Sequence, residues 1–230
     1  MMKSEDLVSF EVIEKETDIM VSAEKHLENQ AREAVINYRR DIENYIKRNQ
    51  AFLTSLEPVR VRGDAPEIVK VMAEAGKKAG VGPMAAVAGA VAEFVGRELI
   101  KFSEEIIVEN GGDIFIRTGR KRSIGVYAGD KSPFTGRLAI EIGPSLDGVG
   151  ICTSSGTVSH SLSFGMADAA IIISKDTSLA DAVATAAGNI VKSEADIEKG
   201  IGLAKSVDGV AGALILIGDK MASWGDIKLV

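Results

Sequence analysis

Two oxygen-bearing side chains lie four residues apart in the segment SLADAVATAAGN, residues 178–189. On a helix, positions i and i+4 lie on one face, so Asp181 and Thr185 would point in the same direction. The alanines around them leave room for a ligand or for a neighbouring backbone. A carboxylate and a hydroxyl suit a hard cation such as Mg²⁺, which keeps water ligands and takes others from phosphate. Asp181 and Thr185 are therefore candidate ligands of Mg²⁺.

The same segment has a structural interpretation. Ser178 and Asp181 have the spacing of a capping box in its acidic form, in which the two side chains bind backbone N–H groups at the start of their own helix. From the spacing alone we favour this cap over a metal site.

A glycine pair stands between two strand-like segments in ENGGDIFIRTG, residues 109–119. Glycine adopts positive φ angles readily, so the sequence from Asn110 to Asp113 predicts a tight hairpin turn. In the functional alternative, the missing side chains at Gly111 and Gly112 let a ligand approach the backbone. Taken alone, the motif favours the turn.

A third segment, GICTSSGTVSHS at residues 150–161, leads from a strand into a hydroxyl-rich loop. Amides and hydroxyls of such a loop can hold a phosphate or a carbonyl oxygen. A hydrolase would use Ser154 or Ser155 as nucleophile, with His160 as base and Asp168 to orient it. The G-x-S-x-G pattern is absent, which speaks against this interpretation.

The first hundred residues predict a hairpin followed by helices. Apolar and polar residues alternate over 7–13 and 17–22, as in two strands with one buried face. Residues 23–51 carry one apolar stripe at helical spacing. Residues 65–80 predict a second helix that ends at a glycine, and a third runs from Pro83 to about residue 101. The third is lined with alanine and glycine, so we expect it to lie close against another backbone.

The second half of the chain predicts several strands, then helices, then strands again. Strand-like segments separated by glycine-containing turns occupy residues 105–109, 113–118, 123–128, 137–142, 149–153 and 168–174. Helices are expected at 178–191 and 194–206, a strand at 210–217 and a last short strand at 226–229. This order indicates an α+β fold rather than regular β-α alternation. We expect one domain over residues 1–230.

Composition excludes some classes of function. Hydrophobic residues make up 46% and charged residues 26%, as in soluble globular proteins. The net charge of −6 provides no general basic surface for nucleic acid or an anionic membrane. Cys152 is the single cysteine, which suits a reducing compartment, and we expect it to be a small core residue. We expect a cytoplasmic protein that binds neither nucleic acid nor membrane, and leave a homo-oligomer open.

Taken in order, the NGGD turn, the TSSG loop with its histidine and the segment LADAVATA resemble the second half of the FAD:protein FMN transferase (ApbE) family. In that family a glycine pair follows a strand as N-x-G-G-D/N, and a T-S-G loop precedes a histidine. A helix with the pattern A-D-A-L-A-T-A comes later, and here residues 180–186 are ADAVATA. The hairpin, long helix and small-residue helix precede these motifs in the family's order.

The resemblance implies a flavin-transferase type of α+β fold, with mixed or antiparallel sheets and flanking helices. It implies Mg²⁺ bound by Asp181 and Thr185 and bridging to the pyrophosphate of FAD, with a threonine hydroxyl of a partner protein as acceptor. His160 is the candidate catalytic residue. The residues expected to bind FAD lie in the turn and in the loop: Asn110, Gly111, Gly112 and Asp113, and Thr153, Ser154, Ser155 and Gly156.

Two departures from the family pattern bear on activity. The family has a Lys-Gly pair where this chain has Ala88-Gly89, and its H-x-x-D-P-x-T-G segment is reduced here to residues 160–165 without Asp-Pro. We also expect no lipoprotein signal, which is common in the family. Two functions follow. One is a Mg²⁺-dependent transferase or hydrolase acting on FAD or a related pyrophosphate-containing nucleotide. The other is a flavin- or nucleotide-binding protein that has lost FMN transfer.

Overall fold

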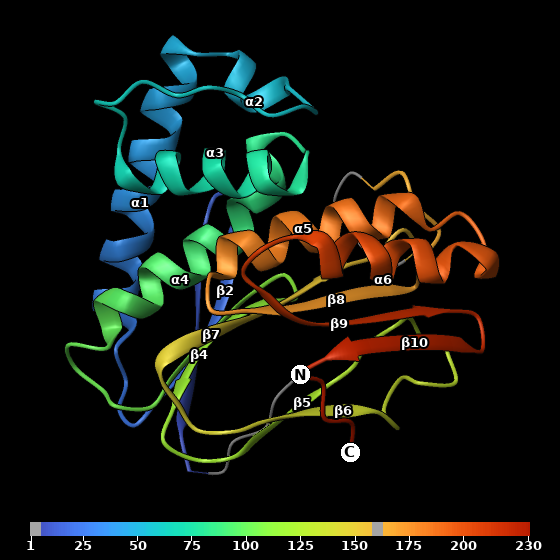
Figure 1. Ribbon diagram of the computed structural model, residues 1–230. Helices are drawn as coiled ribbons and strands as arrows, with labels where there is room; N and C mark the ends of the chain where they lie inside the picture. The colour runs from blue at the N-terminus through green and yellow to red at the C-terminus, as the bar shows by residue number, and fades with distance from the viewer. Residues whose placement is uncertain (1–5, 158–162) are drawn as a thin grey trace.

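In a computed structural model, which describes residues 6–157 and 163–230, eight strands form one antiparallel sheet (Figure 1). Its strand order is β1-β2-β3-β4-β7-β8-β9-β10, and a separate hairpin pairs β5 with β6. The α+β prediction is confirmed. The strands are β1 (Val8–Glu14), β2 (Thr17–Ala23), β3 (Ile106–Asn110), β4 (Asp113–Thr118), β5 (Arg122–Gly125), β6 (Ala139–Ile142), β7 (Ser145–Ser154), β8 (Ala169–Ser174), β9 (Val210–Ile217) and β10 (Lys220–Gly225).

Helices cover one face of the large sheet, and the β5-β6 hairpin covers the other (Figure 1). On the helical face α4 packs on β3 and β4, α5 on β7 and β8, and α6 on β9, while α3 lies on α5 farther from the sheet. The helices are α1 (Glu28–Arg48), α2 (Ala51–Thr54), α3 (Glu67–Ala79), α4 (Val87–Leu99), α5 (Thr177–Ile190) and α6 (Ile197–Ser206), with single 3₁₀ turns η1 (Pro83–Ala86) and η2 (Glu194–Asp196).

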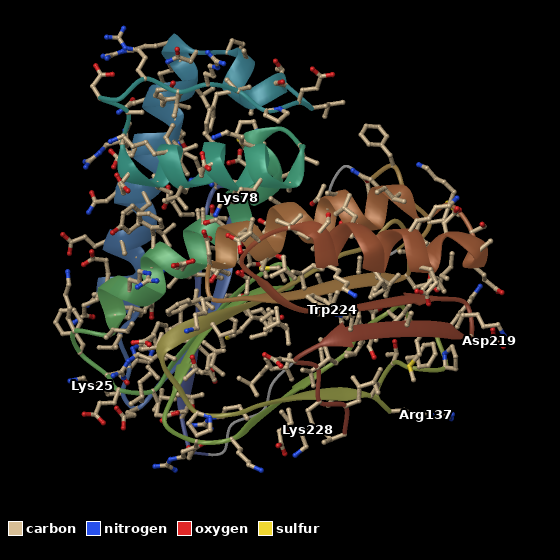
Figure 2. All side chains as sticks on the ribbon, viewed as in Figure 1. Lys25, Lys78, Arg137, Asp219, Trp224 and Lys228 are labelled. Carbon is tan, nitrogen blue, oxygen red and sulfur yellow. The ribbon has the colours of Figure 1, made fainter. Side chains whose placement is uncertain are left out.

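The sheet is buried on both faces at its centre. In β8, Ile172 belongs to the core beneath the helices, whereas Ile171 and Ile173 belong to the core beneath the β5-β6 hairpin. A strand covered on both sides needs no polar alternation, which is why residues 169–173 are continuously apolar. Charged side chains such as Arg137 and Asp219 project outward from the molecule (Figure 2).

The chain bends sharply between α3 and α4. Gly80 ends α3 in the left-handed conformation, with φ of 73°, and Pro83 opens η1, as the sequence predicts. Within the described ranges no single helix is long and apolar enough to cross a membrane. The pair Glu67–Ala79 and Pro83–Leu99 would reach that length and composition only together, across a bend of 106°.

Two elements differ from the sequence prediction. The helix expected over residues 23–51 is shorter at both ends, since α1 spans Glu28–Arg48, and α2 follows it as a separate single turn. The last strand is β10, which pairs with β9 through a two-residue turn. Residues 226–229 form no strand of their own but lie along β6, through the bridge between Leu229 and Ile140 and a hydrogen bond from the N–H of Glu141 to the carbonyl oxygen of Lys228. The side chains of β10 are mostly exposed because it forms an edge of the sheet, so its sequence carries little apolar signal.

Candidate functional site

Helices α4 and α5 touch through their backbones near their N-termini. A Cβ atom at Gly89 would lie 2.5 Å from the carbonyl oxygen of Thr177 and 2.8 Å from Cβ of Asp181. Real Cβ atoms do not approach so closely, so the crossing requires glycine at position 89. The small-residue helix therefore lies against another backbone, as expected, and that backbone belongs to α5.

Each of these two helices supplies a carboxylate to the N-terminus of the other. Asp181 on α5 accepts a hydrogen bond from the backbone N–H of Gly89 in the first turn of α4, at 2.9 Å. Glu93 on α4 accepts one from the N–H of Thr177, the first residue of α5, at 2.7 Å. The first N–H groups of a helix have no partner within it and favour anions. This exchange fixes where Asp181 lies.

The N-terminus of α5 is capped by a different residue from the one that the capping-box hypothesis named. The cap is Asp176, whose carboxylate accepts from the N–H of Leu179 at 2.9 Å. Asp181 caps α4 instead of its own helix, so the hypothesis is wrong. It fails because Asp181 lies in the second turn of α5, where the N–H groups already have partners within the helix.

A cavity of about 360 Å³, called here the first cavity, lies at this crossing. Its lining includes Asp181, Thr185, Gly111 and Leu56. Among the residues that the structure describes, no lysine or arginine lines it. Asp181 and Thr185, one turn apart on α5, thus share a cavity with the turn and the loop singled out above. Its polar lining comes from α5, from β4 and β7 and from the segment after α2: Ser55, Asp113, Thr153, Ser154, Asp181, Thr185 and Asn189.

The two carboxyl groups of the first cavity are buried and act on each other. Burial raises the pKa of Asp113 to about 7, although the neighbouring Cys152 and the hydrogen bond from the N–H of Thr153 oppose this shift. Burial also raises the pKa of Asp181 well above its usual value, and the charge of Asp113 adds to this, whereas the N–H of Gly89 opposes it. Atom Oδ1 of Asp113 is buried without a hydrogen-bond partner. Such a pair favours a bound proton or cation over two free charges.

The Asn110–Asp113 segment is a two-residue hairpin turn, as the structural interpretation predicts. Asn110 and Asp113 pair directly, and Gly111 and Gly112 have φ angles of 63° and 110°. Gly111 and Asp113 line the first cavity, whereas Asn110 donates a hydrogen bond from Nδ2 to the carbonyl oxygen of Ala88, at 3.1 Å. The turn therefore forms one side of the cavity and ties it to α4.

The hydroxyl loop contributes only its first half to the first cavity. Thr153 and Ser154 line it, while Ser155 and Gly156 are not part of its described lining. Ser155 accepts a hydrogen bond from the N–H of Thr157, and a Cβ atom at Gly156 would lie 2.1 Å from the carbonyl oxygen of Gly165. These contacts indicate that Ser155 and Gly156 shape the loop.

The remaining members of the hydrolase hypothesis are not brought together. His160 lies outside the described residues. The carboxylate of Asp168 accepts hydrogen bonds from Thr157 Oγ1 at 2.9 Å and from the N–H of Gly218 at 2.7 Å, so it holds two loops. Cys152 is fully buried, its thiol donates to the carbonyl oxygen of Thr177, and burial raises its pKa, as expected of a core residue.

Sequence reasoning missed several residues that build the site. Glu93 directly follows the small apolar run of its helix at residues 87–92, and Asp176 is a cap-forming residue directly before a helix, so both left a signal. Leu56 and Phe164, 58% and 51% exposed, form an apolar edge of the first cavity and left none, because exposed apolar residues are common.

Comparisons with known proteins extend over most of the chain. A sequence model of the family described as AbpE bacteria matches residues 1–208. A UPF0280 protein of Methanococcus aeolicus is 39% identical over 221 residues, which cover 94% of this chain and 88% of that protein. A UPF0280 protein of Methanosarcina acetivorans is 41% identical over 220 residues, which cover 94% of this chain and 86% of that protein.

Two solved structures share the fold. The ApbE protein of Thermotoga maritima superimposes with a TM-score of 0.56 at 15% identity, over 94% of this chain and 96% of that one. The apo flavinyl transferase ApbE of Pseudomonas stutzeri gives 0.53 at 14% identity, over 95% and 94%. At these identities the likeness is one of architecture.

Proposed function

Because this chain belongs to the AbpE bacteria family, we propose that its first cavity binds Mg²⁺ together with a pyrophosphate-containing nucleotide, and that this nucleotide is FAD. The composition of the cavity carries the proposal. Two buried carboxyl groups, Asp113 and Asp181, share it with hydroxyl groups, and its described lining contains no basic side chain. A diphosphate would be repelled by ionised carboxylates unless a cation lay between them.

The residues present fit a magnesium ion. Asp181 and Thr185 would hold it, and the unpartnered Oδ1 of Asp113 is a third oxygen nearby. The described residues contain no cluster of three or more His, Cys, Asp or Glu that could bind a metal ion by itself. Mg²⁺ suits such a site because it keeps several waters and takes further oxygens from phosphate. When bound, it would neutralise the diphosphate and make its phosphorus more electrophilic.

Other groups of this chain would orient the nucleotide. The N–H groups at the start of α4 already have partners, Val87 in the carbonyl oxygen of Met84 and Gly89 in Asp181, so side chains supply the donors. The hydroxyls of Thr153 and Ser154 are donors for the remaining phosphate oxygens.

We propose that the bound pyrophosphate is split, in a transferase or hydrolase reaction. A second function, binding without transfer, is favoured by one observation. Ala88 lines the first cavity at the position where the resemblance places a lysine, so this chain lacks that cationic contact to the nucleotide.

The two functions separate in one set of assays. Titration of the purified protein with FAD, with and without Mg²⁺, should show binding that requires the ion, and Thr185→Val should weaken it at least about tenfold without loss of stability. Thr54→Val, at an exposed position at the end of α2, is the matched control. Release of AMP, with or without covalent flavin on an added acceptor, identifies an enzyme. Binding without AMP release identifies the second function, and absence of any Mg²⁺-dependent FAD binding overturns both.

A further inference from the structure

An extended stretch of chain, residues 58–62 with the sequence PVRVR, connects α2 to α3 on the outer side of the helices (Figure 1). This connecting segment belongs to no helix and to no strand of the described structure. Its side chains nevertheless alternate as in a strand. The two valines are half-buried, whereas Arg60 and Arg62 are exposed. Val61 packs against the core beneath the helices, so the segment is held in place while its arginines face solvent.

The backbone of the connecting segment has hydrogen-bonding groups without partners. Among the described residues, nothing binds the N–H or the carbonyl oxygen of Val59, Arg60 or Val61. Local bonding resumes at Arg62, whose carbonyl oxygen accepts from the N–H of Ala65 at 3.1 Å. Consecutive unpaired N–H and C=O groups in an extended chain are what the open edge of a sheet offers to a further strand. A peptide in the same conformation can therefore pair with this segment.

The connecting segment lies in a basic region of an acidic protein. The chain as a whole has a net charge of −6. Residues 47–63, however, contain four basic side chains and one acidic side chain: Lys47, Arg48, Arg60, Arg62 and Glu57. Arg60 forms no ion pair with any described residue, and Arg62 pairs with Asp64 at 3.1 Å, with the two side chains 78% and 73% exposed. So exposed a pair contributes little to stability, and both guanidinium groups are available to carboxylates of a partner.

The unpaired backbone favours a protein partner over other anions. A nucleic acid or an anionic lipid offers phosphate to the arginines, but neither has alternating N–H and C=O groups for the backbone of residues 59–61. We propose that the connecting segment docks an acidic, extended segment of a partner protein, which adds to it as a β-strand. Because Arg60 and Arg62 point to the same side, the partner's carboxylates recur at every second residue. The inference does not depend on the proposed nucleotide site.

The probe is a fluorescein-labelled peptide in which glutamate and threonine alternate, with both termini blocked. Fluorescence anisotropy at low salt should show that the unmodified protein binds it. Arg60→Glu should weaken this binding about tenfold or more, because the peptide then faces a carboxylate in place of a guanidinium group. Arg137→Glu makes the same change in charge at an exposed residue that projects from the opposite end of the molecule (Figure 2), and should leave the affinity unchanged.

Two N-methylated peptides test the backbone pairing on the unmodified protein, so this measurement does not depend on how Arg60→Glu folds. A paired strand uses the N–H groups of alternate residues. Methylation of the glutamates or of the threonines should therefore abolish binding in one peptide and leave it in the other. Equal binding by both methylated peptides, unchanged binding by Arg60→Glu, or no binding of the parent peptide overturns the inference. A single-stranded oligonucleotide that binds more tightly than the peptide and loses as much affinity with Arg60→Glu also overturns it, because this surface would then bind nucleic acid.

Discussion

In the absence of metal, the stability of the Asp113→Asn variant relative to the unmodified protein should increase as the pH rises. Asp113 is buried, and its pKa is raised from 3.8 to about 7, mainly by that burial. Between these values the folded state holds a proton that the unfolded state has released. The stability of the unmodified protein is therefore greatest below the unfolded pKa and falls as the pH rises through this window. Asparagine has a similar shape and does not titrate.

The magnitude follows from the width of the window. One pH unit between the two pKa values corresponds to about 1.4 kcal/mol, so from about pH 5 to pH 7 the unmodified protein should lose roughly 2–3 kcal/mol relative to Asp113→Asn. For a chain of this length that difference corresponds to about 5–10 °C in Tm. Asp113→Asn should also lower the pKa of Asp181, because the charge of Asp113 is one cause of that raised pKa. The pH dependence of stability that Asp181 contributes therefore decreases in the variant as well.

The assay is urea unfolding of both proteins in EDTA at several pH values, followed by circular dichroism. The informative quantity is how the difference in unfolding free energy between the two proteins changes with pH. The difference at a single pH also contains a pH-independent effect of altered hydrogen bonds. Asp18→Asn, at an exposed position of β2, makes the same change in net charge and should give a curve parallel to that of the unmodified chain. Parallel curves for Asp113→Asn as well would refute the assignment of a buried, protonated carboxyl group.

Two further predictions concern the crossing of α4 and α5. Gly89→Ala places a methyl group 2.5 Å from the carbonyl oxygen of Thr177. We therefore expect the free energy of unfolding in urea to fall by about 1–3 kcal/mol and Mg²⁺-dependent FAD binding to weaken. Unchanged stability would show that the helices separate freely. Glu93→Ala leaves the N–H of Thr177 without its partner and should lower the free energy of unfolding by about 1–3 kcal/mol. Glu93→Gln keeps an acceptor and should lower it less. Calorimetric melting of both variants checks this order, and equal losses would contradict it.

The sequence predicts the fold well where burial leaves a pattern. The β1-β2 hairpin alternates because one face is buried, and β8 is continuously apolar because both are. Prediction fails at β10, whose mostly exposed side chains need not be apolar. It also overestimates the length of α1, since Leu27 before its first residue provides no side-chain cap that would mark the start.

The site is harder to predict because its contacts join distant parts of the chain. Spacing placed Asp181 and Thr185 on one helical face, yet it favoured a cap on the same helix over any other partner. The partner is Gly89, 92 residues earlier, and no local pattern connects the two positions. Only the order of three motifs, matched to a family, brought the turn, the loop and α5 together. That order gave no information on Glu93, whose role depends on how α4 and α5 pack.

Asp181 has two roles, and this limits what its substitution can reveal. One oxygen, Oδ2, caps α4 through Gly89, while the side chain as a whole lines the first cavity. Alanine at this position would remove the cap and the proposed metal ligand together, so lost activity in that variant would not separate folding from binding. Thr185 lines the same cavity, and the described structure gives its hydroxyl no part in capping α4 or α5. The metal hypothesis is therefore tested more directly at Thr185 than at the more conspicuous aspartate.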